Sequence, residues 1–201
     1  MTDMKRHIIL LVLAAFIPAC MVAQDWKAPK YLKGAVPQNK QGVVYFKQDC
    51  NTAKEISKAK IFALLREYVT DSLVAGPNAT KGQCRIVEED AEKGILAVRM
   101  DEQLWFKRSA WTSHGTRFLY DLVFSVQDNA YTVEMQRLRY LYNAQENENV
   151  EPELRTAEQW ITDSEALDKK GRLLRRARQF RVFTIERKNE VFEGAWKAVT
   201  K

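Results

Sequence analysis

Residues 118–126, with the sequence FLYDLVFSV, decide the fold class of this chain. The even-numbered positions of this stretch are all apolar: Phe118, Tyr120, Leu122, Phe124 and Val126. Alternation with a period of two predicts a β-strand that has one face in a hydrophobic core. Asp128 and Asn129 follow as a tight-turn signal, so we expect the chain to reverse there into a second, antiparallel strand.

The second strand of this hairpin changes face part-way along. Its apolar residues lie at odd positions as far as Met135 and at even positions from Leu138 to Tyr142. A period-two pattern can change face only where a residue is inserted. The sequence therefore predicts a β-bulge near Gln136 and Arg137.

Three more strands are expected before the hairpin, over residues 43–46, 84–89 and 96–106. In the last of these the apolar residues share one face, with Glu102 as the exception, and Asp101 falls on the opposite face. We expect that opposite face, together with Asp121 of the next strand, to be exposed to solvent.

Helices are expected on both sides of the strands. Thr52, with Glu55 three residues later, fits a capping box, so a helix should begin there and end before Gly76. A short helix over 156–167 and a long one over 179–199 are expected near the C-terminus. Together these elements predict an α+β domain: a curved antiparallel sheet packed on a long C-terminal helix, in the order β-α-β-β-β-β-α with an extra short helix.

Residues 1–23 have the features of a secretory signal peptide that is cleaved after Ala23. Lys5 and Arg6 precede an apolar run of about ten residues, which is too short to span a membrane. We therefore expect an exported protein of the periplasm or cell envelope. An outer-membrane lipoprotein is the alternative, because the residues before Cys20, IPA, approximate a lipobox in which Cys20 is acylated. A retained membrane anchor is the third option.

After the signal peptide we expect an exposed lead-in over residues 24–41 and a single domain over 42–201. The lead-in contains Pro29 and Pro37 and shows little periodicity. The chain has 46% hydrophobic and 29% charged residues, which excludes the disordered and polytopic membrane classes. Its net charge of +6 falls to +5 without residues 1–23, which hold two basic residues and one acidic residue. This mild excess indicates no particular partner.

Cys50 and Cys84 are the cysteines that remain after cleavage at Ala23. In an oxidising compartment they either form one disulfide or stay separate as two small buried hydrophobic residues. Nothing in the sequence brings their Cα atoms within bonding range, so both options stay open.

Catalytic patterns are weak in this sequence. Ser113 stands beside His114 in a loop expected over 111–115, which makes an envelope hydrolase the alternative function. Adjacent loop residues rarely give a nucleophile and its base the geometry that they need. The sequence also lacks metal-ligand spacings and phosphate-binding loops. We therefore predict no catalytic residues, no metal and no cofactor.

The strongest polar feature is a basic segment over residues 169–181, which contains no acidic residue. Guanidinium groups suit phosphate or carboxylate, so four of its arginines are candidates for contact with a ligand or anion. These candidates are Arg172, Arg175, Arg176 and Arg178. The alternative is a solvated segment whose arginines pair with nearby carboxylates.

Parts of the chain resemble a known bacterial family. The sequence YLKGAVP at 31–37, running into GVVYF at 42–46, resembles the opening of that family, and AEQWITD at 157–163 resembles its C-terminal half. The family consists of exported proteins described as a domain of unknown function with a TBP-like fold, and the resemblance spans residues 31–199. It implies a strand, a helix, an antiparallel sheet and a C-terminal helix, and it implies no catalytic residues. A TBP-like backbone does not imply DNA binding.

We therefore predict a non-enzymatic, exported binding or interaction module of the cell envelope. Its contact surface would be the arginine segment, or a pocket between the sheet and the terminal helix. The expected partner is an envelope component or a small ligand, and nucleic acid is not expected outside the cytoplasm. Membrane contact would arise only through lipidation or lipid headgroups. The alternatives are a hydrolase using Ser113 and His114 and a purely structural envelope protein.

Overall fold

The computed structural model describes residues 25–108, 113–142 and 151–201. The strands in chain order are β1 (Tyr45–Asn51), β2 (Arg85–Asp90), β3 (Ile95–Arg108), β4 (Ser113–Gln127), β5 (Ala130–Tyr142) and β6 (Glu153–Thr156). The helices are η1 (Pro29–Tyr31), α1 (Lys58–Tyr68), η2 (Val69–Val74), α2 (Ala157–Trp160), α3 (Asp163–Ala166) and α4 (Arg175–Thr200). Among the described residues, no helix is long and apolar enough to cross a membrane.

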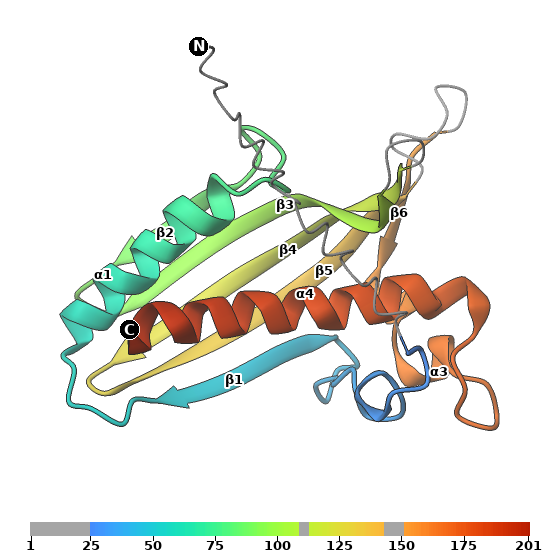
Figure 1. Cartoon of the computed structure of the whole chain (residues 1–201), viewed down its shortest axis with the longest axis horizontal. Helices are drawn as coiled ribbons and strands as arrows, with labels where there is room; N and C mark the ends of the chain where they lie inside the picture. The colour runs from blue at the N-terminus through green and yellow to red at the C-terminus, as the bar shows by residue number, and fades with distance from the viewer. Residues whose placement is uncertain (1–24, 109–112, 143–150) are drawn as a thin grey trace, which may run out of the picture.

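The strands form one antiparallel sheet in the order β1-β5-β4-β3-β2, and β6 pairs with β5 beyond the end of β1. Helices α1 and α4 lie on the same face of this sheet, and α4 runs along its length (Figure 1). The predicted fold class is therefore confirmed: an α+β domain with an open antiparallel sheet and a long C-terminal helix.

The hydrophobic core lies between the sheet and these two helices. The sheet contributes fully buried side chains such as Leu122 and Met135. Leu65 of α1 and Val182 and Val191 of α4 meet them from the other side and are equally buried. The alternation of β4 thus places its even positions in the core, where burial of apolar surface stabilises the fold.

The β-bulge predicted in β5 is present. The pairing of β4 with β5 steps from Leu119 with Arg139 to Asp121 with Gln136, so two residues of β5 lie opposite one residue of β4. Arg137, one of the two, has a φ of 56°. This insertion lets the apolar residues change from odd to even positions while they stay on the core face.

The expected start of the first helix was wrong. Helix α1 begins at Lys58, and its N-cap is Ser57, whose hydroxyl accepts from Lys60 N. The Thr52 hydroxyl instead donates to Asn129 O at 3.0 Å and so fastens the end of β1 to the hairpin of β4 and β5. The capping-box pattern failed because residues 52–57 do not form a helix: side chains of the β4–β5 turn, Asn129 and Asp128, accept from the backbone N–H groups of Ile56 and Lys58.

The expectation of an exposed lead-in over 24–41 also needs correction. Tyr31 and Val36 are buried in the core. The Tyr31 hydroxyl donates to Glu186 Oε1 on α4 at 2.6 Å, and the backbone carbonyl of Tyr31 accepts from Arg181 Nε at 2.7 Å. The segment before β1 is therefore partly built into the fold, although most of its side chains are exposed.

Candidate functional site

Three of the four predicted arginines line one groove at the start of α4. Arg172 precedes the helix, and Arg175 and Arg178 belong to its first turns, because α4 begins four residues earlier than expected. The groove has a volume of about 800 Å³. Its other walls include Trp26 from the N-terminal segment and apolar side chains such as Leu173. We call this site the basic groove.

The basic groove has an excess of positive charge, because five basic side chains line it against the two carboxylates of Asp25 and Asp168. No side chain caps the N-terminus of α4, and the first turn holds no acidic residue. This end of a helix carries partial positive charge from the aligned peptide dipoles, so arginines accumulate where cations are unfavourable. Arg172 pairs with Asp168 at 2.7 Å, whereas Arg175 is exposed and forms no ion pair with any described residue. Arg178 lies 5.6 Å from the centre of the Trp26 ring.

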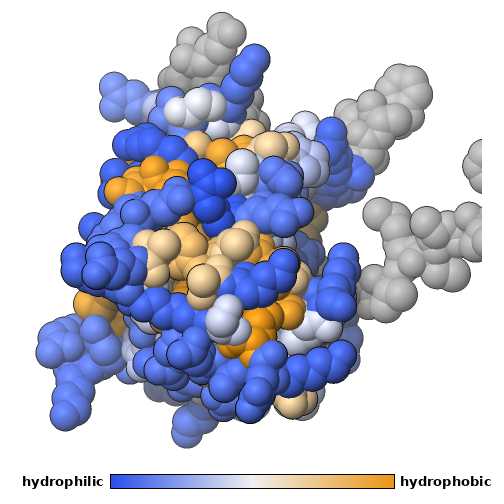
Figure 2. All heavy atoms as spheres, turned by 90° about the vertical axis from the view of Figure 1, so that its left-hand side faces the viewer, coloured by the Kyte–Doolittle hydropathy of each residue, from blue (hydrophilic) through white to orange (hydrophobic). Residues whose placement is uncertain are grey.

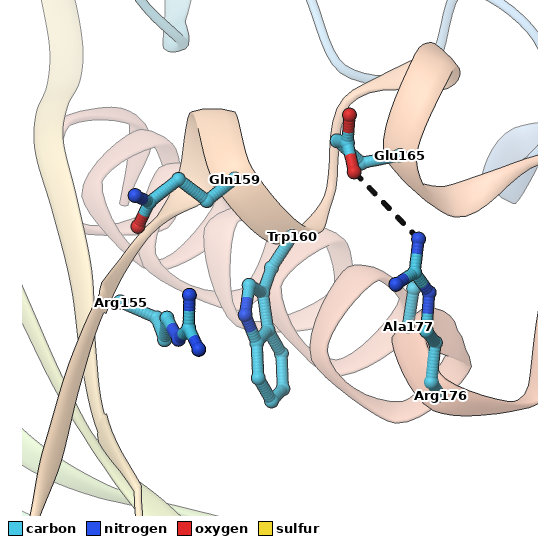
Figure 3. A pocket seen from close by; sticks show the side chains of 6 residues that line it. All are labelled: Arg155, Gln159, Trp160, Glu165, Arg176 and Ala177. Carbon is cyan, nitrogen blue, oxygen red and sulfur yellow. Dashed lines mark ion pairs between the residues drawn. The ribbon is translucent and has the colours of Figure 1, made fainter.

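The fourth predicted arginine, Arg176, lines a second cavity on another side of the same helical turn. We call this site the Trp160 cavity. It has a volume of about 290 Å³, and the described residues that line it are Arg155, Gln159, Trp160, Glu165, Arg176 and Ala177. Figure 3 shows Arg155 and Arg176 on either side of the indole, with Glu165 near Arg176. Because successive residues of a helix point about 100° apart, the arginine run is divided between the two sites.

Arg181, the last arginine of the basic segment, is not part of either cavity. Its side chain is completely buried, and its guanidinium donates to the carbonyls of Tyr31, Leu32 and Ile161 and to the carboxylate of Asp163. Burial lowers the pKa of Arg181, and the pairing with Asp163 partly offsets this. This arginine therefore joins the N-terminal segment to α4.

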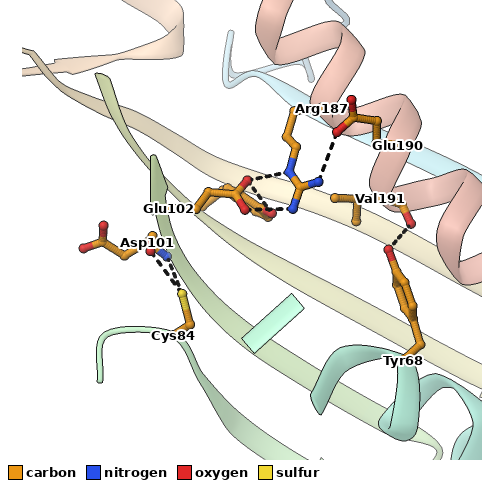
Figure 4. Close-up of polar contacts among 8 residues, drawn as sticks. Tyr68, Cys84, Asp101, Glu102, Arg187, Glu190 and Val191 are labelled. Atoms are coloured by element: carbon orange, nitrogen blue, oxygen red, sulfur yellow. Dashed lines mark hydrogen bonds and ion pairs between the residues drawn. The ribbon is translucent and has the colours of Figure 1, made fainter. Parts of the chain in front are cut away.

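Glu102, the exception in the apolar pattern of β3, forms a buried ion pair with Arg187 of α4 (Figure 4). Both carboxylate oxygens accept from the guanidinium at 2.8 Å, and the Tyr120 hydroxyl donates to Oε1 at 3.1 Å. Burial lowers the pKa of Arg187, but the hydrogen bonds and the negative charge of Glu102, together with smaller contributions from Tyr120 and Glu190, raise the pKa overall. Burial also raises the pKa of nearby Tyr68 to about 12. Every polar group of this cluster has a partner within the protein.

The expectation that Asp101 and Asp121 face solvent was wrong, because both are buried. Arg117 on the neighbouring strand pairs with Asp101, and Arg137 at the bulge pairs with Asp121. These ion pairs form across the sheet, on the face opposite to Glu102. The carboxylates are therefore neutralised by arginines that cross-strand pairing brings near them.

The Ser113 and His114 pair is not arranged for catalysis. Residues 113–115, expected in a loop, belong to β4. Consecutive residues of a strand point to opposite faces, so the hydroxyl and the imidazole diverge. The His114 ring lies 5.4 Å from that of Phe106, next to the core, whereas Ser113 is exposed. The geometry of a nucleophile and its base is missing here.

Cys50 and Cys84 do not form the disulfide that the sequence left open; both are free and buried. Cys50 lies in β1, and Cys84 directly precedes β2, so three strands separate them. Neighbouring strands are about 4.8 Å apart, which puts the two Cα atoms far beyond disulfide range. Residues 1–23, including Cys20, lie outside the described residues.

A further cavity, of about 530 Å³, lies between α1 and the last turns of α4. Figure 2 views the molecule from the side where these two elements meet and shows hydrophobic surface surrounded by hydrophilic residues. The walls mix acidic residues such as Glu67 with basic ones such as Lys197. This cavity therefore lacks the excess of positive charge that the basic groove has. The described residues also contain no cluster of three or more potential metal ligands of the His, Cys, Asp or Glu type.

Part of this fold matches the model of a known protein family. Residues 48–141, which run from within β1 to one residue before the end of β5, match the family model described as a domain of unknown function (DUF4468) with TBP-like fold. The chain carries a DUF4468 domain. The basic groove and the Trp160 cavity are built from residues outside the part that matches the DUF4468 model.

Solved structures agree with this assignment. A DUF4468 family protein from Bacteroides ovatus is 28% identical, with a TM-score of 0.74, over 86% of this chain and 94% of that chain. A TBP-like protein from Parabacteroides distasonis is 18% identical, with a TM-score of 0.66, over 82% of this chain and 96% of that chain. The second likeness supports the fold alone. A search among curated proteins found no match.

Proposed function

We propose that this DUF4468 protein is a non-enzymatic binding module of the cell envelope and that its basic groove takes an amphiphilic anion. The proposal rests on one observation: Arg172, Arg175 and Arg178 line a groove in which they lie beside the apolar side chains of Trp26, Leu32, Leu173 and Leu174. A phosphate or carboxylate would meet the guanidinium groups, and an attached apolar chain would lie against Trp26 and Leu173.

The local electrostatics support this proposal. Positive side chains at an uncapped helix N-terminus repel one another and the helix dipole, each by about 0.3–1 kcal/mol. An anion bound there would offset this electrostatic repulsion. Local arrangements that cost stability are expected at functional sites. Location in the envelope is supported by the signal-like pattern of residues 1–23.

Binding of dodecyl phosphate, measured by isothermal titration calorimetry below its micellar concentration, tests the groove. We expect binding of dodecyl phosphate but not of uncharged dodecyl maltoside. The double variant R172Q/R175Q should weaken binding of the phosphate at least tenfold, because charge-assisted hydrogen bonds are lost. The control K81Q/R85Q makes the same change of charge at exposed residues outside the groove and should bind as the wild type does.

Equal binding by the two double variants would contradict the proposal. Native mass spectrometry of the protein from its own host tests the location. A mass beginning at Gln24 supports soluble export, and an acylated mass beginning at Cys20 supports the lipoprotein alternative. An uncleaved chain would contradict export by either route.

A further inference from the structure

We propose that the Trp160 cavity is a second binding site and that it takes one acidic sugar residue, of the uronic acid type. This site has its own lining residues and does not depend on the function of the basic groove. The proposal is based on an aromatic platform, a mixed set of hydrogen-bonding groups and an excess of guanidinium charge.

The platform is the indole of Trp160, which is half-buried and held from two sides. Phe180 of α4 packs edge-on against it with ring centres 3.9 Å apart, and Tyr142 of β5 lies 5.8 Å away. These contacts come from different elements and fix the orientation of the indole. A sugar ring has one face of C–H groups, which packs well on an aromatic surface, and a rim of hydroxyl groups.

The polar groups around the indole suit that rim, because they include donors and an acceptor. Gln159 accepts from Thr156 N through Oε1 at 3.0 Å, which orients its amide and leaves Nε2 to donate. Glu165 and Arg176 are 3.7 Å apart, too far for a hydrogen bond to satisfy either group. A hydroxyl group both donates and accepts, so adjacent hydroxyls could bond to both residues.

The charge of the cavity favours an acidic sugar over a neutral one. Two guanidinium groups flank the indole, while Glu165 supplies the one carboxylate among the described residues that line the cavity. Arg155 is paired with Glu153, but its Nε is buried without a hydrogen-bond partner among the described residues. Arg176 is the more exposed of the two arginines and is therefore the expected partner of a sugar carboxylate.

The size of the cavity distinguishes it from the basic groove. Its volume of about 290 Å³ suits a single ring, whereas the groove has about 800 Å³. A free phosphate would fill little of this space and would leave the indole uncovered. Glu165 is an acceptor, to which a hydroxyl of the sugar would donate while the carboxylate of the same sugar meets Arg176.

Ligand-observed NMR and calorimetry with two methyl glycosides test this site on the full mature chain. Saturation transfer from the protein is expected to methyl β-D-glucuronide, and the matched neutral sugar, methyl β-D-glucoside, should bind at least tenfold more weakly. R176Q should weaken binding of the glucuronide about tenfold and leave the glucoside unchanged. W160F should weaken both sugars.

Two controls separate this site from the rest of the molecule. W105F makes the same change in a tryptophan outside the cavity, and R172Q/R175Q alters the basic groove; both should bind the glucuronide as the wild type does. Circular dichroism verifies that each variant is folded, and R176Q alters an exposed side chain that the core does not require.

Three results would overturn the proposal: absence of saturation transfer, equal affinity for both glycosides, or glucuronide binding that R176Q and W160F leave unchanged. Displacement of the glucuronide by equimolar inorganic phosphate would overturn the assignment to a sugar.

Discussion

At the scale of single residues, a notable feature of this protein is an ion pair buried in its hydrophobic core. Glu102 and Arg187 place opposite charges inside the core, where their side chains are 2% and 17% exposed. Removing such charges from water is costly, and the ion pair offsets the cost only while both partners are present. Loss of one partner leaves the other charge uncompensated in a medium of low polarity.

We expect R187M to lower the free energy of unfolding by about 3–5 kcal/mol, because it leaves the Glu102 carboxylate buried without its ion-pair partner. The double variant E102L/R187M should recover much of that loss, since it removes both charges. Urea denaturation of the single and double variants measures this coupling. The control R66M breaks an exposed pair with Glu89 and should cost less than about 1 kcal/mol. Similar losses in R187M and R66M would show that the buried pair is unimportant.

At the scale of elements, the bulge in β5 separates the part of this strand that pairs with β1 from the part that pairs with β6. Strand β1 pairs with β5 up to Gln136, and β6 pairs with it from Arg139 onward. Arg137 lies between these segments in the left-handed region of backbone conformation, which costs an L-residue other than glycine about 1–2 kcal/mol. The bulge keeps both halves of the strand facing the core.

At residue 137, glycine is therefore expected to give a more stable protein than alanine. R137G and R137A both remove the ion pair with Asp121, and R137G should be the more stable by about 1 kcal/mol. The order should reverse at Arg139, which lies in the same strand without a positive φ: R139A should be more stable than R139G. Thermal unfolding of the four variants tests both orders. The same preference at both positions would contradict the conformational explanation.

At the scale of the whole molecule, Arg181 links segments that are distant in the sequence. It donates to the N-terminal segment, to Ile161 between α2 and α3 and to Asp163 at the start of α3, and Asp163 also accepts from Gly34 N at 2.7 Å. The same N-terminal segment contributes Trp26 and Leu32 to the walls of the basic groove, whose other walls come from residues 168–178. The position of Trp26 relative to α4 therefore depends on this buried arginine.

Hydrogen exchange measured by mass spectrometry should detect this dependence. R181M removes the donors to three backbone carbonyls and leaves the Asp163 carboxylate without its ion-pair partner. The backbone amides of residues 28–36 and 161–167 should therefore exchange faster. Amides of β3 and β4 should keep their protection, because their pairing does not involve Arg181. R176M, an exposed change on the same helix, should leave both regions as in the wild type. Uniformly faster exchange in R181M would instead indicate general destabilisation.

The fold class could be predicted from sequence because it follows from local backbone geometry. Side chains of a strand alternate between two faces, so the apolar positions of β4 report the buried face directly. The change of phase after Met135 likewise required an inserted residue, which the structure contains at Arg137 and Leu138. The signal-like pattern at the N-terminus remains a prediction.

The candidate sites depended on contacts between distant segments, which local patterns do not contain. Arg176 and Arg181 looked alike in the basic run, yet one lines a cavity and the other is buried against carbonyls 150 residues away. In the sequence, Trp160 is one residue of the segment AEQWITD, and nothing in that segment indicates a cavity. Its cavity exists because tertiary packing brings Arg155, Glu165 and Arg176 around it. The sequence alone thus determined which side chains are apolar or charged and which period they follow. Only the tertiary structure decided which charges meet a partner, because that depends on strand register and on where the helices pack.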